Sequence, residues 1–480
     1  MPLQLTWQAI VRFIIVLIAP LVLPYSTTAD QAAGNLPKPN FIIILIDDLG
    51  WADVGCYGST FYETPNIDTM AAEGMKFTDG YAACPVCSPT RAAILTGKYP
   101  ARLKLTEFLY GQRIERSSPI LPAKYKQYLG REEVTIAEVL KSAGYATAHI
   151  GKWHLGREQF YPEHQGFDVN IGGTHYGYTR SFFWPGWRGY VSVEGRHEGE
   201  YLPERLSEEA VRFIESNKDK PFFLHLSHYL VHIPMEAKKE MIAKYQTKLN
   251  STKGCQNNPI YAAMIESMDL SVGRVMEALK RLEIDDRTVV FFTSDNGGLA
   301  WKDRANTPAT CNAPLRGGKQ QLYEGGIRVP WIVKWSGVIE AGSACNVPVI
   351  STDYFPTILE IIGIKNSKTN GPIDGVSNLP LLKQSGKLKR DAIFWHYPHF
   401  CLQGVRPGGI IRQGDYKLIE RYEDGTLELY DLKHDISETR NLAFEMSART
   451  RQLRQLLHQW RESVKANMPL PNPHYHQPEK

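Results

Sequence analysis

The run PVCSPTRAAILTG, residues 85–97, places a cysteine at the start of a predicted short helix and an arginine one turn further on. Ser88 is a good N-cap and Pro89 a good first helical residue, while the final glycine supplies a left-handed end. Arg91 lies four positions after Cys87, so its guanidinium can fold back toward the sulfur. Free amide donors at the helix N-terminus suit an anion. A buried or disulfide-bonded cysteine before an ordinary helix explains this run, taken alone, equally well.

Four apolar runs predict buried β-strands, and each ends in residues that could do chemistry. They are 41–46, followed by Asp47 and Asp48; 145–150, followed by Lys152 and His154; 222–226, followed by His228 and His232; and 289–293, followed by Asp295 and Asn296. Ligands of open α/β sheets bind at the carboxyl ends of the strands. Four such endings therefore indicate one site.

Three carboxylates and one amide oxygen follow two of these strands: Asp47, Asp48, Asp295 and Asn296. An all-oxygen set suits a hard cation, calcium first and magnesium second. Without a cation the carboxylates would repel, by roughly 4 kcal/mol for two charges 4 Å apart near a protein surface. Either pair alone is explained more simply as a loop cap or a turn.

Two segments carry a resemblance to a known family. Residues 85–97 resemble the first signature of the type I sulfatases, in which the cysteine of Cys-x-Pro-x-Arg is oxidised after synthesis to formylglycine. The run GYATAHIGKWH, residues 144–154, resembles the second signature. The likeness extends from about Pro39 to about Leu442. It implies an alkaline-phosphatase-like α/β core.

The resemblance also implies a metal shell formed by Asp47, Asp48, Asp295, Asn296 and the modified Cys87. A hydrated formylglycine has two hydroxyl groups. One, made more nucleophilic near the cation, attacks sulfur and expels the alcohol, which leaves sulfate esterified to the enzyme. The second hydroxyl then loses its proton and expels sulfate, which an ordinary serine or cysteine could not do.

Charged residues receive roles by the same resemblance. Lys152 and Lys319 grip sulfate oxygens, Arg91 braces the formylglycine, His154 serves its hydroxyl, and His232 faces the leaving alcohol with Lys319 as the rival acid. Histidine suits proton transfer because it titrates near neutrality. Taken singly, each histidine is explained more simply as a hydrogen-bonded structural residue, and Lys319 as a surface lysine. We expect His225 to pack in the core, and the role of His228 stays open.

Two aromatic stretches, 172–187 and 395–399, could contact a substrate ring or simply pack. The resemblance carries over Thr174, His175 and His396 as substrate-binding residues. Aromatic faces beside hydrogen-bonding groups suit sugar rings, so the stretches favour a sulfated carbohydrate.

The N-terminus has the pattern of a secretory signal. Arg12 precedes an apolar run, 13–23, which is followed by small and polar residues through Ala29. The run is short for a membrane span, so we predict cleavage near Ala29 and an exported protein, with an uncleaved anchor as the alternative. We expect no stable membrane span.

The charge balance argues against a nucleic-acid-binding protein, and the cysteine count limits the possible disulfides. The 55 basic and 51 acidic side chains give a net charge of only +4 over 480 residues, without the clustered basic face of a nucleic-acid-binding protein. Setting Cys87 aside leaves six cysteines, enough for up to three bridges. Cys84 makes a Cys-x-x-Cys with Cys87, so a redox dithiol is a competing hypothesis.

The predicted fold is a mostly parallel sheet covered by helices, with a small C-terminal α+β domain. The predicted parts are a signal peptide (1–29), a catalytic domain (38–388), a C-terminal domain (389–467) and a tail (468–480). In the C-terminal domain, strands within 408–419 and 426–430 flank a turn at Asp424-Gly425, and 446–466 is helical.

The sequence therefore predicts an exported, calcium-dependent sulfatase. Its substrate would be a sulfated small molecule or glycan, and its partner a formylglycine-generating maturation enzyme. The alternatives are a phosphoester or phosphonate-ester hydrolase of the same superfamily, and a non-catalytic binder of sulfated polysaccharide.

Overall fold

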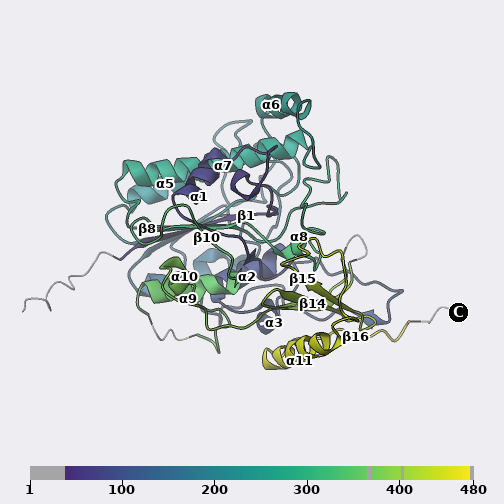
Figure 1. Ribbon diagram of the computed structural model, residues 1–480. Helices are drawn as coiled ribbons and strands as arrows, with labels where there is room; N and C mark the ends of the chain where they lie inside the picture. Colours follow the sequence, from purple (N-terminus) through teal and green to yellow (C-terminus); the bar gives the residue numbers. More distant parts are fainter. Residues whose placement is uncertain (1–37, 365–368, 402–404, 476–480) are drawn as a thin grey trace, which may run out of the picture. The chain divides into compact units, whose positions relative to one another are not determined.

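The computed structural model describes residues 38–364, 369–401 and 405–475 (Figure 1). Within these ranges no helix has the length and apolar character of a membrane span. The predicted signal peptide, 1–29, lies outside the described residues.

An eight-stranded sheet forms the centre, in the order β10-β2-β9-β8-β1-β7-β5-β6. Its strands are β1 (Asn40–Ile46), β2 (Met75–Phe77), β5 (Ala146–Gly151), β6 (Val169–Ile171), β7 (Phe222–Ser227), β8 (Thr288–Ser294), β9 (Trp331–Lys334) and β10 (Ser343–Cys345). The four predicted strands are confirmed as β1, β5, β7 and β8. They are neighbours, in the order β8-β1-β7-β5, and pair in parallel, so their carboxyl ends share one edge.

The residues of β1 alternate between two apolar cores, because successive side chains of a strand point to opposite faces. Ile42, Ile44 and Ile46 join the core under α1 (Pro65–Ala72), α5 (Leu202–Ser216) and α7 (Pro259–Arg281). Phe41, Ile43 and Leu45 join the core under α2 (Cys87–Thr96), α4 (Ile136–Ser142), α9 (Tyr354–Ile361) and α10 (Leu379–Leu382). Figure 1 shows helices on both faces of the sheet. The predicted fold class is confirmed.

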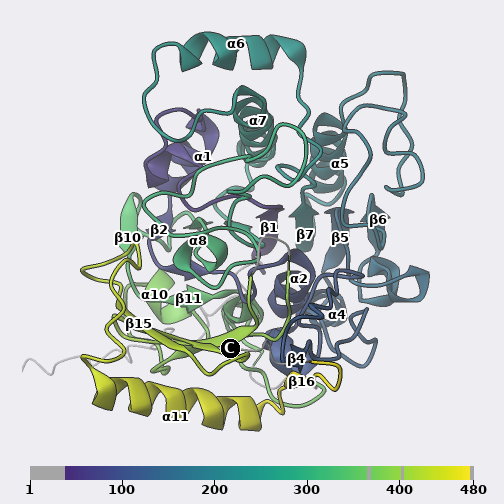
Figure 2. The same ribbon diagram turned by 90° about the vertical axis from the view of Figure 1, so that its right-hand side faces the viewer.

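A four-stranded antiparallel sheet follows in the chain (Figure 2). Its strands are β12 (Ile393–Tyr397), β13 (Gly408–Gln413), β14 (Tyr416–Arg421) and β15 (Leu427–Asp431), and α11 (Ser447–Ser463) packs on it through Leu453, Leu457 and Trp460. The Asp424-Gly425 hairpin joins β14 to β15 as expected. The run 408–419 is two strands, because Gly414 takes a left-handed φ of 60° and turns the chain between them. The domain boundary at 388 stays a prediction.

The shorter elements connect these layers. They are β3 (Gly80–Tyr81), β11 (Val349–Ile350), β4 (Ile120–Leu121), β16 (Leu470–Pro471), α3 (Pro100–Leu103), α6 (Lys239–Leu249), α8 (Glu324–Ile327) and the 3-10 turns Gly55–Tyr57, Glu158–Phe160, Pro162–His164 and Ser351–Asp353. The pairing of β16 with β4 attaches part of the predicted tail to the main body.

One disulfide, Cys255–Cys311, joins described residues, where the cysteine count allowed up to three. Cys84 and Cys87 are separate thiols, so the Cys-x-x-Cys is not bridged here. Cys84 Sγ instead lies 3.9 Å from the carbonyl of Thr106.

Candidate active site

Helix α2 begins at Cys87, with Val86 in the N-cap position, so the expectation that Ser88 caps the helix is wrong. The Ser88 hydroxyl donates to the carbonyl of His154 at 2.8 Å and is therefore committed to another segment. Gly97 ends the helix with a left-handed φ of 68°, as predicted. The first turn of α2 is thereby joined to the residues after β5.

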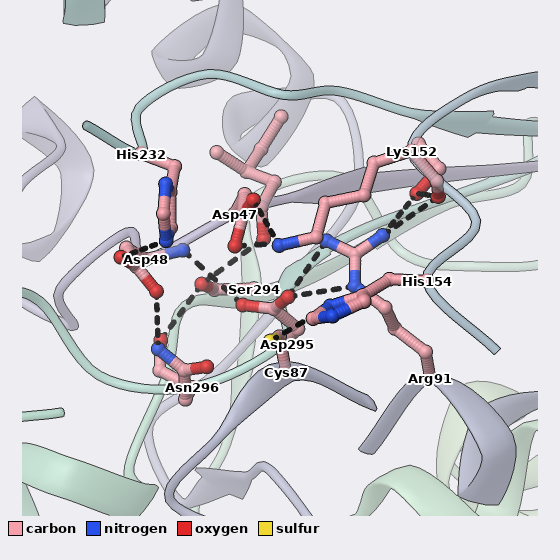
Figure 3. A network of polar contacts seen from close by, with 12 residues as sticks. Asp47, Asp48, Cys87, Arg91, Lys152, His154, His232, Ser294, Asp295 and Asn296 are labelled. Carbon is pink, nitrogen blue, oxygen red and sulfur yellow. Dashed lines mark hydrogen bonds and ion pairs between the residues drawn. The ribbon is translucent and has the colours of Figure 1, made fainter. Parts of the chain in front are cut away.

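The Cys87 side chain is buried, and its sulfur lies 3.3 Å from Nδ1 of His154 (Figure 3). Burial raises the pKa of the Cys87 thiol, against the lowering effect of Lys152 and Lys319. The unmodified cysteine is thus a neutral thiol at neutral pH, which is a weak nucleophile.

Arg91 does not fold back onto the sulfur as expected. Its Nε and Nη2 donate to Asp295 Oδ2 at 2.8 and 2.7 Å, and its Nη1 donates to the Lys152 carbonyl at 2.9 Å and Ser227 Oγ at 2.6 Å. Burial lowers the pKa of Arg91, but Asp295 and Asp47 outweigh it and raise the pKa. The guanidinium therefore ties α2 to the ends of β5, β7 and β8.

Two lysines pair with the two aspartates that follow β1. Lys152 Nζ lies 2.6 Å from Asp47 Oδ2, and Lys319 Nζ lies 2.7 Å from Asp48 Oδ2. Burial raises the pKa of Asp47 well above its usual value, since Lys152 only partly offsets it and two other carboxylates are near. Burial also acts on Asp48, but Lys319 and His232 outweigh it and lower the pKa.

Two oxygens of this cluster have no hydrogen-bond donor among the described residues. They are Asp47 Oδ1 and Asn296 Oδ1, both buried. A buried acceptor without a partner costs about 1–3 kcal/mol, which a hard cation would offset. Donor atoms of Asp47, Asp48 and His232 also lie within 4.8 Å of one another. The residues present therefore fit a divalent cation.

Asp295 and His232 differ from the predicted ligand set in detail. Asp295 Oδ2 is occupied by Arg91, and its Oδ1 accepts the Asp48 amide at 3.2 Å, so Oδ1 is the oxygen with the fewer partners. His232 Nε2 lies 3.6 Å from Asp48 Oδ2, while its Nδ1 lies 2.8 Å from the Ile233 carbonyl. Burial, together with Lys319, holds the pKa of His232 well below its usual range. His232 thus stands beside the cation site as well as in the cavity above it.

His154 is held in a left-handed conformation with a φ of 56°, uncommon for a residue with a side chain. Its amide donates to the Thr174 carbonyl at 3.0 Å, and its carbonyl accepts from Ser88. A Cβ on Gly177 would come within 2.3 Å of His154 Cε1, so this position requires glycine. Gly177 was missed by the sequence reasoning, although it lies in the glycine-rich aromatic stretch.

Above Cys87 lies a cavity of about 220 Å³. It is lined by Cys87, Phe108, His154, Gly177, Tyr178, His232, Ile233, Leu299, Trp301, Asp303, Arg304, Lys319 and Gln320. The fold thus brings four predicted site residues to one cavity, namely Cys87, His154, His232 and Lys319. The predicted acidic ligands lie beneath them. Phe108 and the Trp301–Arg304 segment were missed, because no local pattern shows which surface loop covers a strand end.

The predicted substrate contacts do not line this cavity. Thr174 donates to the Tyr190 carbonyl and accepts the Tyr176 amide, so it shapes the loop that holds His154. His175 lies against Tyr176 and bonds Tyr161. His396 has both ring nitrogens engaged, 2.7 Å from Tyr422 Oη and 2.9 Å from the Asn467 carbonyl.

The two other histidines are structural. His225 is buried with its Nδ1 3.1 Å from Nδ1 of His149, as expected for a core residue. His228 is also buried and lies 3.0 Å from Ser271 Oγ on α7, and burial lowers its pKa to about 4. Neither residue lines the cavity.

Lys319 reaches the site from a loop that the C-terminal sheet holds in place. Arg316 Nη1 donates to the Glu438 carbonyl at 2.9 Å and to Tyr430 Oη at 3.2 Å. Beneath the loop, Lys417 Nζ lies 3.0 Å from Glu324 Oε1 and 2.8 Å from Glu438 Oε1, and all three side chains are fully buried. The C-terminal sheet therefore takes part in positioning a site residue.

The model of the Sulfatase family matches residues 39–364. The chain belongs to the sulfatase family. A second family model, N-sulphoglucosamine sulphohydrolase, C-terminal, matches residues 318–465. The resemblance of the two signatures is thereby confirmed, and the protein is a sulfuric ester hydrolase. Membership implies a metal cofactor and a formylglycine residue in general terms.

Individual sulfatases are similar over most of the chain. A sulfatase of Formosa agariphila is 33% identical over 90% of this chain and 89% of its own. Human N-acetylgalactosamine-6-sulfatase is 34% identical over 76% of this chain and 69% of its own. The crystal structure of Ps i-CgsB in complex with k-i-k-neocarrahexaose has a TM-score of 0.75 at 29% identity, covering 92% of this chain and 95% of that one.

Proposed function

We propose that this sulfatase removes sulfate from a sulfated carbohydrate, using a formylglycine made from Cys87 and a calcium ion held by Asp47, Asp48, Asp295 and Asn296. The observation that carries the proposal is the meeting of the Cys87 side chain with buried, unpartnered Asp47 and Asn296 oxygens at one sheet edge. The relatives named for N-acetylgalactosamine 6-sulfate and crystallised with a neocarrahexaose support a carbohydrate substrate.

We prefer calcium to magnesium, because a set of carboxylate and amide oxygens supplied by the protein suits the more flexible coordination of calcium. A cation bound there would stabilise the alkoxide form of a hydroxyl on residue 87. Asp48 keeps its negative charge in this setting, since Lys319 and His232 offset its burial and lower its pKa.

The chain's own residues divide the remaining work. His154 Nδ1, 3.3 Å from the Cys87 sulfur, is placed to take a proton from a hydroxyl on residue 87. Lys152 and Lys319 supply fixed positive charge for sulfate oxygens. Arg91 positions Asp295 and the Lys152 carbonyl rather than touching substrate.

His232 lines the cavity above Cys87 and is placed to face the leaving alcohol. Its replacement should slow esters of poor leaving groups more than activated aryl esters, since only the former need a proton. Because burial and Lys319 hold the pKa of His232 low, this difference should be larger in acid than at neutral pH. Equal losses on both classes would remove this role.

The mass of the tryptic peptide Phe77–Arg91, from protein purified from its own source, tests the nucleophile. We expect an aldehyde or its hydrate at position 87. An intact thiol, or a disulfide to Cys84, would overturn the formylglycine assignment.

Release of sulfate and phosphate from matched aryl esters tests the reaction class, with Cys87→Ala as the control. We expect sulfate release that the variant lacks. Faster phosphate release would favour the phosphoester or phosphonate-ester hydrolase. Binding of sulfated polysaccharide without turnover, kept in the variant, would favour a non-catalytic binder.

Removal of divalent metal tests the cation. Exhaustive chelation should abolish turnover and lower the melting temperature, and calcium should restore both better than magnesium. Full activity after chelation would overturn the calcium assignment.

Export is part of the proposal, with a formylglycine-generating enzyme as the maturation partner. The signal-like N-terminus and the Cys255–Cys311 disulfide support it, because disulfides persist in oxidising compartments. N-terminal sequencing of the native protein should find a start near residue 30. A start at Met1 would contradict cleavage.

A further inference from the structure

The loop between Leu299 and Thr310 forms one side of the cavity above Cys87. The cavity, about 220 Å³, is smaller than typical small-molecule pockets of roughly 300–1,000 Å³. It therefore accommodates one ring bearing the sulfate, and groups on that ring lie within reach of this loop. Trp301, Asp303 and Arg304 are the loop residues that line it.

The loop is fixed at both its ends and its tip. The amides of Ala309 and Thr310 donate to the Leu299 carbonyl at 3.0 and 3.2 Å, which closes its base. At the tip, Thr307 Oγ1 accepts the Arg304 amide at 3.0 Å. A compact loop whose ends meet in this way presents its side chains from a defined backbone.

Neighbouring segments hold the loop from outside. Asn258 Nδ2 donates to the carbonyls of Asn306 and Pro308 at 2.8 and 3.1 Å. The disulfide Cys255–Cys311 joins the residue after the loop to the segment preceding α7. Trp301 packs, partly buried, against the apolar core below. Binding side chains carried on such a loop need little further ordering when a ligand arrives.

Arg304 is the cavity-lining cation of this loop, and its guanidinium is only loosely paired. Its side chain is 65% exposed, and the ion pair recorded for it among described residues is a 4.0 Å approach of Nε to Asp303 Oδ2. That separation is too long for a hydrogen bond. Lys319, the other cation of the cavity wall, is by contrast held at 2.7 Å by Asp48.

We propose that Arg304 binds a second acidic group of the substrate, a carboxylate or a further sulfate on the sugar, while Trp301 contacts the ring. This inference rests on the proposed function. A guanidinium presents two parallel N–H donors that match the oxygens of a carboxylate or sulfate. Asp303 orients the guanidinium by its charge. The preferred substrate is thus a sugar with two acidic groups.

The decisive measurement compares Arg304→Ala with wild type on four substrates: an aryl monosulfate, a monosulfated hexosamine, the disulfated hexosamine, and a monosulfated uronic acid. Wild type should prefer the sugars with two acidic groups. The variant should lose about ten-fold in kcat/KM on those sugars, as expected for a charge-assisted hydrogen bond, and change less than about two-fold on the aryl ester. The two diacidic sugars distinguish a sulfate from a carboxylate as the bound group.

Arg440→Ala is the matched control, because Arg440 is 71% exposed and does not line the cavity. It should leave all four substrates unchanged. Equal losses by Arg304→Ala on every substrate, or no loss on the diacidic sugars, would overturn the inference.

Binding to the Cys87→Ala protein separates this inference from the proposed function. Calorimetry should find tighter binding of the disulfated than of the monosulfated hexosamine, and the added Arg304→Ala change should abolish the difference. This result does not depend on turnover, so Arg304 can be tested even if no sulfate is released. Equal affinities in the Cys87→Ala protein would overturn the inference.

Discussion

The two sides of the active site are built in different ways. On one side, Asp47, Lys152 and Asp295 follow β1, β5 and β8 of the parallel strands, and Arg91 of α2 ties these strand ends together. On the other side, Lys319 and Arg304 stand on loops held by the C-terminal sheet, a disulfide and side-chain bonds. The first side grows directly out of the core strands, whereas the second is held by contacts made outside those strands. Chemistry should therefore depend on the strand side together with Lys319, and substrate choice on the Arg304 loop.

Arg91→Ala should have the largest effect, because it leaves the buried Asp295 carboxylate without the guanidinium that pairs with it at 2.7 Å. We expect a loss of about 3–5 kcal/mol in the free energy of unfolding, together with turnover. Denaturant unfolding measures the first and aryl sulfate hydrolysis the second. Arg281→Ala is the control, since its pair with Glu215 is exposed and contributes at most about 1 kcal/mol. A stable, active Arg91→Ala protein would contradict the strand-side assignment.

Cys255→Ser should come next. Loss of the bridge to Cys311 frees a long loop of the unfolded chain, which typically costs about 2–4 kcal/mol. Because the disulfide borders the Arg304 loop, KM for sulfated sugars should rise while kcat on aryl sulfate stays. Cys345→Ser, at a cysteine with no disulfide, is the control. A fall in kcat alone would place the loop in the chemistry instead.

Arg316→Ala should separate activity from stability. It removes two hydrogen bonds and the stacking of the guanidinium on Tyr323, whose ring centre lies 3.8 Å away. Because Arg316 is exposed, we expect the free energy of unfolding to fall by only about 1 kcal/mol. Turnover should nevertheless fall several-fold, because Lys319 lies three residues on. Arg316→Lys should restore little of it, since lysine lacks the planar fork. Unchanged turnover would show that the C-terminal sheet does not position Lys319.

Glu107→Gln should have the smallest effect on turnover, and its effect should instead appear in the pH dependence of stability. Burial raises the pKa of Glu107 to about 8, although Tyr397 and the Phe108 amide donate to it. A raised carboxyl pKa means that the folded state holds the proton more tightly, so stability falls as pH rises from about 4.5 to 8. Glutamine imitates the protonated acid and should remove that fall. Parallel unfolding curves for the two proteins from pH 5 to 8.5 would contradict the assignment.

Sequence reasoning worked where one local rule decides the outcome. Apolar runs followed by Asp47 or Asp295 predicted strand ends, and parallel pairing then brings such ends together. It failed where the partner is distant. Ser88 has a side chain suited to capping a helix, but its hydroxyl donates a hydrogen bond to the carbonyl of His154, far along the chain. Substrate binding by His396 stays a prediction, although Tyr422 and Asn467 engage both of its ring nitrogens.

Two other misses had a local signal, and a third had none. Gly414-Asp415 is a turn dipeptide and could have divided the run 408–419 into two strands. Gly177 lies in a glycine-rich aromatic stretch, which is typical of a backbone packed closely against a ring. Only the structure shows that this ring is the imidazole of His154. The loop carrying Trp301 and Arg304 has no pattern of its own, because its course is set by Asn258 and the disulfide.

The burial of Lys417 between Glu324 and Glu438 has a consequence for protein engineering. A chain truncated at residue 388 would lose Lys417, one of the cations that balance Glu324, and would uncover the side of α2 that packs on the C-terminal sheet. Chimeras that exchange the C-terminal region between sulfatases should therefore exchange the Lys319 loop with it. The Lys319 loop and the C-terminal region are distant in the sequence, yet a working chimera should take both from the same parent protein.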